Sequence, residues 1–122
     1  DNYGHATGDA VLIRVVNFLC SMIRNVDSIG RIGGEEFATL LPQTDLKTAT
    51  ELAERLRLGL EKLLVIHGEL TINITACFGV TTVNVKHESL DDALKRADQA
   101  LYQAKENGRN RVEQIIQSPI QV

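Results

Sequence analysis

The sequence predicts one sandwich-like domain of the α+β or α/β class, in which helices cover a β-sheet. Three observations support this. The 122 residues are enough for one domain and too few for two. Hydrophobic residues make up 43% and charged residues 24%, which is typical of a chain that buries a core. Segments with helical and with strand periodicity alternate in the order α-β-β-α-β-α-β, without a repeat or linker.

The first half of the chain predicts a helix followed by a β-hairpin. Apolar residues recur at helical spacing across residues 7–24, which gives the predicted helix one core-facing side. Residues 28–32 and 36–41 flank Gly33 and Gly34, and glycine accepts the positive φ angles of tight hairpin turns. The expected core positions of the helix are Leu12, Val15, Val16, Leu19, Met22 and Ile23.

The second half predicts two more helices and two strands. Asp45 and Ser89 are candidate N-caps, and Gly108 is expected to end the last helix. Residues 70–80 alternate strictly and predict one strand, residues 111–116 a final strand, and residues 117–122 a frayed tail. The expected core positions of the two helices are Leu46, Ala49, Leu52, Ala53, Leu56, Leu60 and Leu63, then Leu90, Ala93, Leu94, Ala97, Leu101 and Ala104.

Composition excludes some functions. The net charge of −3 argues against binding a nucleic acid polymer, although it allows a small nucleotide. No apolar run approaches the roughly 20 residues of a membrane helix. Cys20 and Cys77 lie in apolar stretches and lack disulfide or metal-ligand spacing, so we expect buried free thiols and a cytoplasmic domain.

Residues 33–37, Gly-Gly-Glu-Glu-Phe, carry the clearest chemical pattern. Glycines at a hairpin tip let a ligand approach the backbone, and two hard carboxylates beside them suit Mg²⁺ held together with substrate phosphates. Glu35 and Glu36 converge on one site only if the turn is curved, because adjacent strand residues face opposite sides. The alternative is a solvated turn that happens to be acidic. Arg31 is expected to brace the hairpin.

Several further segments add to the pattern of residues 33–37. They are Tyr3-Gly4-His5 with Gly8-Asp9, then Arg24-Asn25-Val26-Asp27, which five residues separate from Gly33, and finally residues 93–110, which include Lys-Arg-Ala-Asp and Gly-Arg-Asn. In this order the chain resembles the GGDEF domain of diguanylate cyclases in its GGEEF variant. The resemblance implies an α+β fold of the nucleotide-cyclase or palm-like type, with a central, partly antiparallel sheet flanked by helices.

The resemblance implies condensation of two GTP molecules into cyclic di-GMP, with loss of two pyrophosphates. Glu35 and Glu36 would be the catalytic and metal-binding carboxylates, for Mg²⁺ or alternatively Mn²⁺. Gly33 and Gly34 would admit the nucleotide to the backbone. The remaining expected substrate-binding residues are Asp9 at the guanine donors, Lys95 at the triphosphate, and His5, which could equally stabilise the start of the helix.

The resemblance also implies feedback inhibition. Arg24 would contact the O6/N7 edge of a product guanine and Asp27 its donor edge, with Arg55 contributing a second product-binding surface. Without the resemblance, Arg24 and Asp27 read as a solvated helix-end pair.

The family domain opens with a strand that this chain lacks; residues 1–116 would form the domain without it, and the sheet is expected to be interrupted there. Catalysis would require a homodimer, because each domain holds one GTP. The full-length protein is expected to carry an N-terminal sensory or receiver module. The alternative functions are a non-catalytic cyclic di-GMP receptor and an interaction module with the same fold.

Overall fold

A computed structural model describes residues 4–116 as two compact units, which share one long helix, α2 (Leu46–Lys62). The first unit comprises residues 4–43 and 59–74, and the second comprises residues 44–58 and 75–116. The tail expected at residues 117–122 lies outside the described residues. Each unit is built from its own strand pairs.

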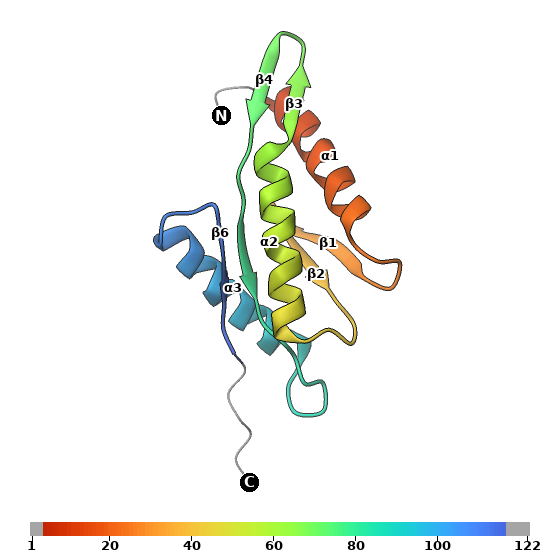
Figure 1. Ribbon diagram of the computed structural model, residues 1–122, viewed down its shortest axis with the longest axis vertical. Helices are drawn as coiled ribbons and strands as arrows, with labels where there is room; N and C mark the ends of the chain where they lie inside the picture. Colours follow the sequence, from red (N-terminus) through yellow and green to blue (C-terminus); the bar gives the residue numbers. More distant parts are fainter. Residues whose placement is uncertain (1–3, 117–122) are drawn as a thin grey trace. The chain divides into compact units, whose positions relative to one another are not determined.

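The first unit contains helix α1 (His5–Met22) and two antiparallel hairpins. One hairpin pairs β1 (Ser28–Gly33) with β2 (Glu36–Leu40), and the other pairs β3 (Leu64–His67) with β4 (Leu70–Asn73), as Figure 1 shows. Helix α1 contacts β3. The apolar side chains buried in this unit include Leu19, Leu60, Val65 and Ile72.

The second unit is a β-α-β arrangement. Strand β5 (Cys77–Val80) pairs in parallel with β6 (Arg111–Gln114), and α3 (Leu90–Glu106) connects them and packs against both strands. A side chain at Gly79 would collide with the backbone of α3 at Ala97 and Leu101. Glycine at this position therefore lets α3 approach the strand closely. The buried positions of the unit are Ala49, Ala53, Leu56, Ala93, Ala100 and Ala104.

The prediction of a single strand over residues 70–80 is wrong. This segment forms two strands, β4 and β5, and residues 74–76 between them have no ladder partner. Pairing with β3 ends where Leu64 meets Asn73, because β3 begins there, and pairing with β6 begins only at Cys77. Alternation shows that a segment is extended and half-buried, but it does not show which strand it pairs with.

Strand β3 was missed by the sequence reading. It replaces the end of a helix that was expected to include Leu63, whereas α2 ends at Lys62. Gly68 and Glu69 form the two-residue turn between β3 and β4, and Gly68 has a φ of +63°. A type II′ hairpin requires glycine at the first turn position. The Gly-Glu pair between two apolar runs was therefore the sequence signal for this hairpin.

The predicted helix caps are confirmed. The Asp45 carboxylate accepts a hydrogen bond from the Thr48 amide at 2.7 Å, and Ser89 forms a capping box with Asp92. After α3, Gly108 has a φ of +120°. The Asp45 and Ser89 side chains accept hydrogen bonds from amides that have no partner within the helix.

Four residues that were expected to be buried are not. Cys20 is exposed and Cys77 only half-buried, because the apolar stretches around them also present outward-facing positions. Met22 and Leu90 are also exposed, since each is a terminal residue of its helix.

The strands of residues 4–116 form three separate two-stranded sheets. Among these residues, no helix combines the length and the apolar character that a membrane crossing requires.

Candidate functional site

The acidic glycine turn joins β1 to β2. Gly33 pairs with Glu36 across the hairpin, so Gly34 and Glu35 form a two-residue turn, and Gly34 has a φ of +45°. A side chain added at Gly33 or Gly34 would meet no atom within 4 Å. A ligand can therefore reach the backbone of Gly33 and Gly34, directly before the two glutamates.

The two glutamates occupy different environments. Glu35 is exposed in the turn, and Glu36 is half-buried at the first position of β2, opposite a glycine. Within residues 4–116, no group of three His, Cys, Asp or Glu side chains could hold a metal ion. The turn thus supplies two hard oxygen donors, and a bound cation would take its other ligands from substrate phosphates and water, as Mg²⁺ commonly does.

Arg31 braces this turn, as the sequence predicted. Its Nε donates a hydrogen bond to the Gly34 carbonyl oxygen at 2.7 Å. The strand register shifts between Arg31 and Gly33, because β1 has one residue more than β2 in this interval. Such a bulge bends a strand and changes the direction of the side chains beside it.

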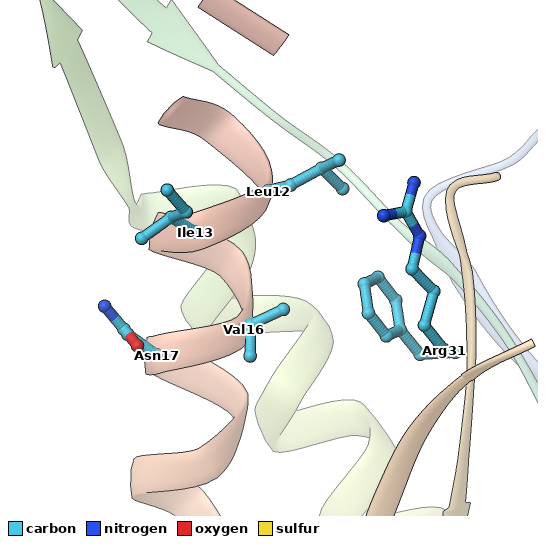
Figure 2. A pocket seen from close by; sticks show the side chains of 6 residues that line it. Leu12, Ile13, Val16, Asn17 and Arg31 are labelled. Carbon is cyan, nitrogen blue, oxygen red and sulfur yellow. The ribbon is translucent and has the colours of Figure 1, made fainter. Parts of the chain in front are cut away.

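A shallow, mainly apolar hollow lies between α1 and the hairpin. In Figure 2, Leu12 and Val16 extend from α1 toward the side on which Arg31 lies. Arg31 and Phe37 are directly opposite each other in the β1–β2 register and therefore share one face of the hairpin. The remaining lining residues of the hollow are Ile13 and Asn17.

Arg24 and Asp27 form a tight pair just after α1. Arg24 Nη2 lies 2.7 Å from Asp27 Oδ1, and the Arg24 amide donates to Oδ2 at 2.7 Å. Arg24 Nη2 also donates to the Pro42 carbonyl oxygen at 3.0 Å. The side-chain hydrogen bonds from Arg24 hold the pKa of Asp27 below its usual value. These two residues therefore connect the end of α1 to the segment after β2.

The other expected site residues are exposed and divide between the two units. His5 and Asp9 lie in the first unit, four residues apart on α1, and so share one side of that helix. Arg55 on α2 and Lys95 on α3 belong to the second unit. Their assigned roles at guanine, triphosphate and product therefore stay predictions.

The structure also contains an arginine network that the sequence reading missed. Arg96 on α3 pairs with Glu88 at 2.7 Å and donates to the Thr81 hydroxyl at 2.7 Å and the Thr82 carbonyl. Hydrogen bonding to Arg96 holds the pKa of Glu88 below its usual value. The network ties the loop after β5 to α3, and sequence spacing gives no indication of contacts of this kind.

A second arginine cluster was also missed. Arg57 on α2 pairs with Glu54 at 2.6 Å and donates to Asn110 Oδ1 at 2.9 Å. The glutamate lies three residues before the arginine on the helix, so this ion pair could have been predicted from spacing. The bond to Asn110 could not, because it joins distant parts of the sequence.

Solved structures define the class to which this fold belongs. The active GGEEF domain of a diguanylate cyclase from Vibrio cholerae superposes with a TM-score of 0.83 at 37% identity, over 97% of this chain and 74% of that one. The GGDEF domain of DgcB from Caulobacter crescentus, in complex with c-di-GMP, gives a TM-score of 0.86 at 30% identity, over 93% and 68%. The fold is the α+β, palm-like fold of GGDEF domains.

The family model described as diguanylate cyclase, GGDEF domain, matches residues 1–111, and the chain belongs to that family. Diguanylate cyclase A of Treponema denticola is 44% identical over 112 residues, which are 92% of this chain and 30% of that protein. Diguanylate cyclase DgcM of Escherichia coli is 46% identical over 112 residues, or 92% and 26%. The chain spans less than a third of the length of these relatives.

Proposed function

We propose that this chain is the catalytic domain of a diguanylate cyclase. In each half-reaction the 3′-oxygen of one GTP bonds to the α-phosphorus of the other, and the bond from that phosphorus to the β-phosphate oxygen breaks. One pyrophosphate leaves and the 3′-hydroxyl proton passes to a base. Two such steps convert two GTP into cyclic di-GMP and two pyrophosphates.

The observation that carries this proposal is the intact Gly-Gly-Glu-Glu-Phe turn. Glu35 is exposed at its tip, and Glu36 is half-buried opposite Gly33. The exposure of Glu35 beside a bare glycine backbone supports our assignment of this carboxylate as the base that accepts the 3′-hydroxyl proton. Relatives that match 92% of the chain carry the name diguanylate cyclase, which supports the same reading.

A divalent cation, Mg²⁺ or Mn²⁺, fits the donor set of Glu35 and Glu36. When bound, it would offset the negative charge that develops on the attacking and leaving oxygens. The chain's part is to present two carboxylates beside a turn with no side chains at Gly33 and Gly34, so that the triphosphate oxygens complete the ligand set.

We assign the exposed polar residues further substrate contacts on the strength of the family to which the chain belongs. Asp9 accepts hydrogen bonds from the guanine N1 and N2 donors, which adenine does not present in the same pattern. His5 lies on the same side of α1 and borders the base. Lys95 provides a positive charge for the triphosphate. Two such domains, each with one GTP, meet as a homodimer for the reaction.

Two glutamates at equivalent turn positions make a direct test. Glu35 and Glu69 are both exposed and both follow a glycine in a two-residue hairpin turn. In the full-length protein, Glu35→Ala should reduce cyclic di-GMP synthesis at least 1,000-fold, the scale of losing a catalytic group, and leave the melting temperature unchanged. Glu69→Ala should leave both unchanged. Near-normal synthesis by Glu35→Ala would remove Glu35 from the mechanism.

The second candidate is a receptor that binds cyclic di-GMP without making it. The Arg24–Asp27 pair favours it, because arginine presents a two-pronged donor to the O6/N7 edge of guanine. A similar domain, that of DgcB, has been solved in complex with c-di-GMP. Binding of cyclic di-GMP by a protein that leaves GTP unconsumed would support the receptor.

A further inference from the structure

The glycine turn that carries Glu35 has little packing to hold it. A side chain at Gly33 or Gly34 would meet no atom within 4 Å, and Gly34 is in the left-handed region at a φ of +45°. Glycine has more backbone freedom than any other residue, so an unpacked Gly-Gly turn samples many conformations unless another contact restrains it. A carboxylate at its tip would move with it.

Arg31 supplies such a contact. Its Nε donates to the Gly34 carbonyl oxygen at 2.7 Å, across three residues of the same hairpin. The hydrogen bond spans the bulge between Arg31 and Gly33, where the regular strand register is interrupted. On the other side, the Arg31 side chain lines the hollow with Leu12 and Val16 of α1 (Figure 2). The Arg31 side chain thus links the edge of this hollow to the open turn.

We propose that Arg31 is a positioning residue: its hydrogen bond to Gly34 fixes the turn and thereby tightens divalent-cation binding by Glu35 and Glu36. It acts through the turn backbone and touches neither substrate nor cation. The opposing possibility is that the positive charge of Arg31 contacts a phosphate directly. The inference deepens the proposed function and rests on it for the role of the carboxylates.

Three substitutions separate the hydrogen bond from the charge. Arg31→Gln places an N–H donor the same number of bonds from the backbone as Nε and removes the charge. Arg31→Met is also neutral and of similar length, but it has no donor. Arg31→Lys keeps the charge and carries its nitrogen one bond farther out. Arg14→Gln, at an exposed position of α1, is the control for loss of a surface arginine.

The measurement is titration of the full-length protein with Mn²⁺ alone, following paramagnetic broadening of the Gly33 and Gly34 amide resonances. Arg31→Gln and Arg14→Gln should stay within about threefold of the unmodified protein. Arg31→Met should need roughly tenfold more Mn²⁺, the effect of losing the hydrogen bond to the turn. Arg31→Gln and Arg31→Met both remove the positive charge, and this loss alone would favour cation binding equally in the two. The difference between them therefore measures the hydrogen bond to Gly34.

A second readout addresses the phosphate contact. Calorimetric binding of a non-hydrolysable GTP analogue in the presence of a chelator should be equal for Arg31→Gln and Arg31→Lys. Equal Mn²⁺ titrations for Arg31→Gln and Arg31→Met, or analogue binding retained by Lys and lost by Gln, would overturn the proposal. Neither readout requires turnover, so absence of cyclic di-GMP synthesis would refute the proposed function and leave this result interpretable. Melting temperatures establish that each variant is folded.

Discussion

Arg24 and Asp27 are bound to each other in a fork-shaped ion pair, with Arg24 Nε 3.1 Å from each carboxylate oxygen of Asp27 and Nη2 2.7 Å from Oδ1. The Asp27 side chain is 1% exposed, whereas that of Arg24 is 55% exposed. A guanine that approached this site would therefore meet Arg24 first. Asp27 would reach the base only after the pair had rearranged, so the arginine is the better target for a test of feedback.

Arg24→Ala should separate product inhibition from catalysis. The substitution removes up to two charge-assisted hydrogen bonds to a guanine, so we expect cyclic di-GMP to bind at least tenfold more weakly. If the proposed feedback operates, the variant should retain the initial rate with GTP and continue synthesis past the cyclic di-GMP concentration at which the unmodified protein stops. Calorimetric titration with cyclic di-GMP measures the affinity.

The same substitution removes the hydrogen bond to the Pro42 carbonyl oxygen and should lower stability. Arg24→Ala is therefore assayed well below its melting temperature. Equal affinity for cyclic di-GMP in both proteins would show that Arg24 serves only to hold the segment after α1.

The Asp27 carboxylate should make stability depend on pH. Hydrogen bonds from Arg24 lower the pKa of Asp27 in the folded state. Its contribution is therefore complete above the unfolded-chain pKa of about 3.9 and is lost as the pH falls through the lower folded value. Asp27→Asn should melt below the unmodified protein at pH 7, and the gap should close below about pH 4. A gap that stays constant from pH 7 to about pH 2.5 would exclude titration of Asp27 as its source.

Gly79 offers a test of the second unit. A methyl group there would collide with the α3 backbone at Ala97 and Leu101, and helix backbone cannot move aside as a side-chain tip can. Gly79→Ala should lower the free energy of unfolding by about 3 kcal/mol, the upper range for overpacking. Gly30→Ala is the control, because a side chain at this β1 position would meet no atom within 4 Å. Denaturant unfolding that gives equal values for both variants would contradict the close packing of α3 on β5.

The features that could be predicted from the sequence are those set by neighbouring residues. The Asp45 and Ser89 caps, the Gly-Gly turn and its brace by Arg31 all depend on contacts across three or four residues. The break between β4 and β5 could not be predicted, because it depends on where β3 and β6 begin.

The Arg96–Glu88 pair was also beyond prediction, since it joins a helix to a loop whose path the sequence does not specify. The exposure of Cys20 depends on which face of α1 is covered. In both cases the outcome depends on packing partners that are distant in sequence.

A domain that joins two GTP molecules releases two products in a fixed ratio, and this ratio can be measured directly. Full-length protein incubated with GTP and Mg²⁺ should release cyclic di-GMP and pyrophosphate, quantified in one sample by chromatography with mass detection and by a coupled pyrophosphate assay. We expect two pyrophosphates for each cyclic di-GMP, and at least 1,000-fold less cyclic di-GMP from the Glu35→Ala variant. Unconsumed GTP in a folded sample that binds cyclic di-GMP would contradict this expectation.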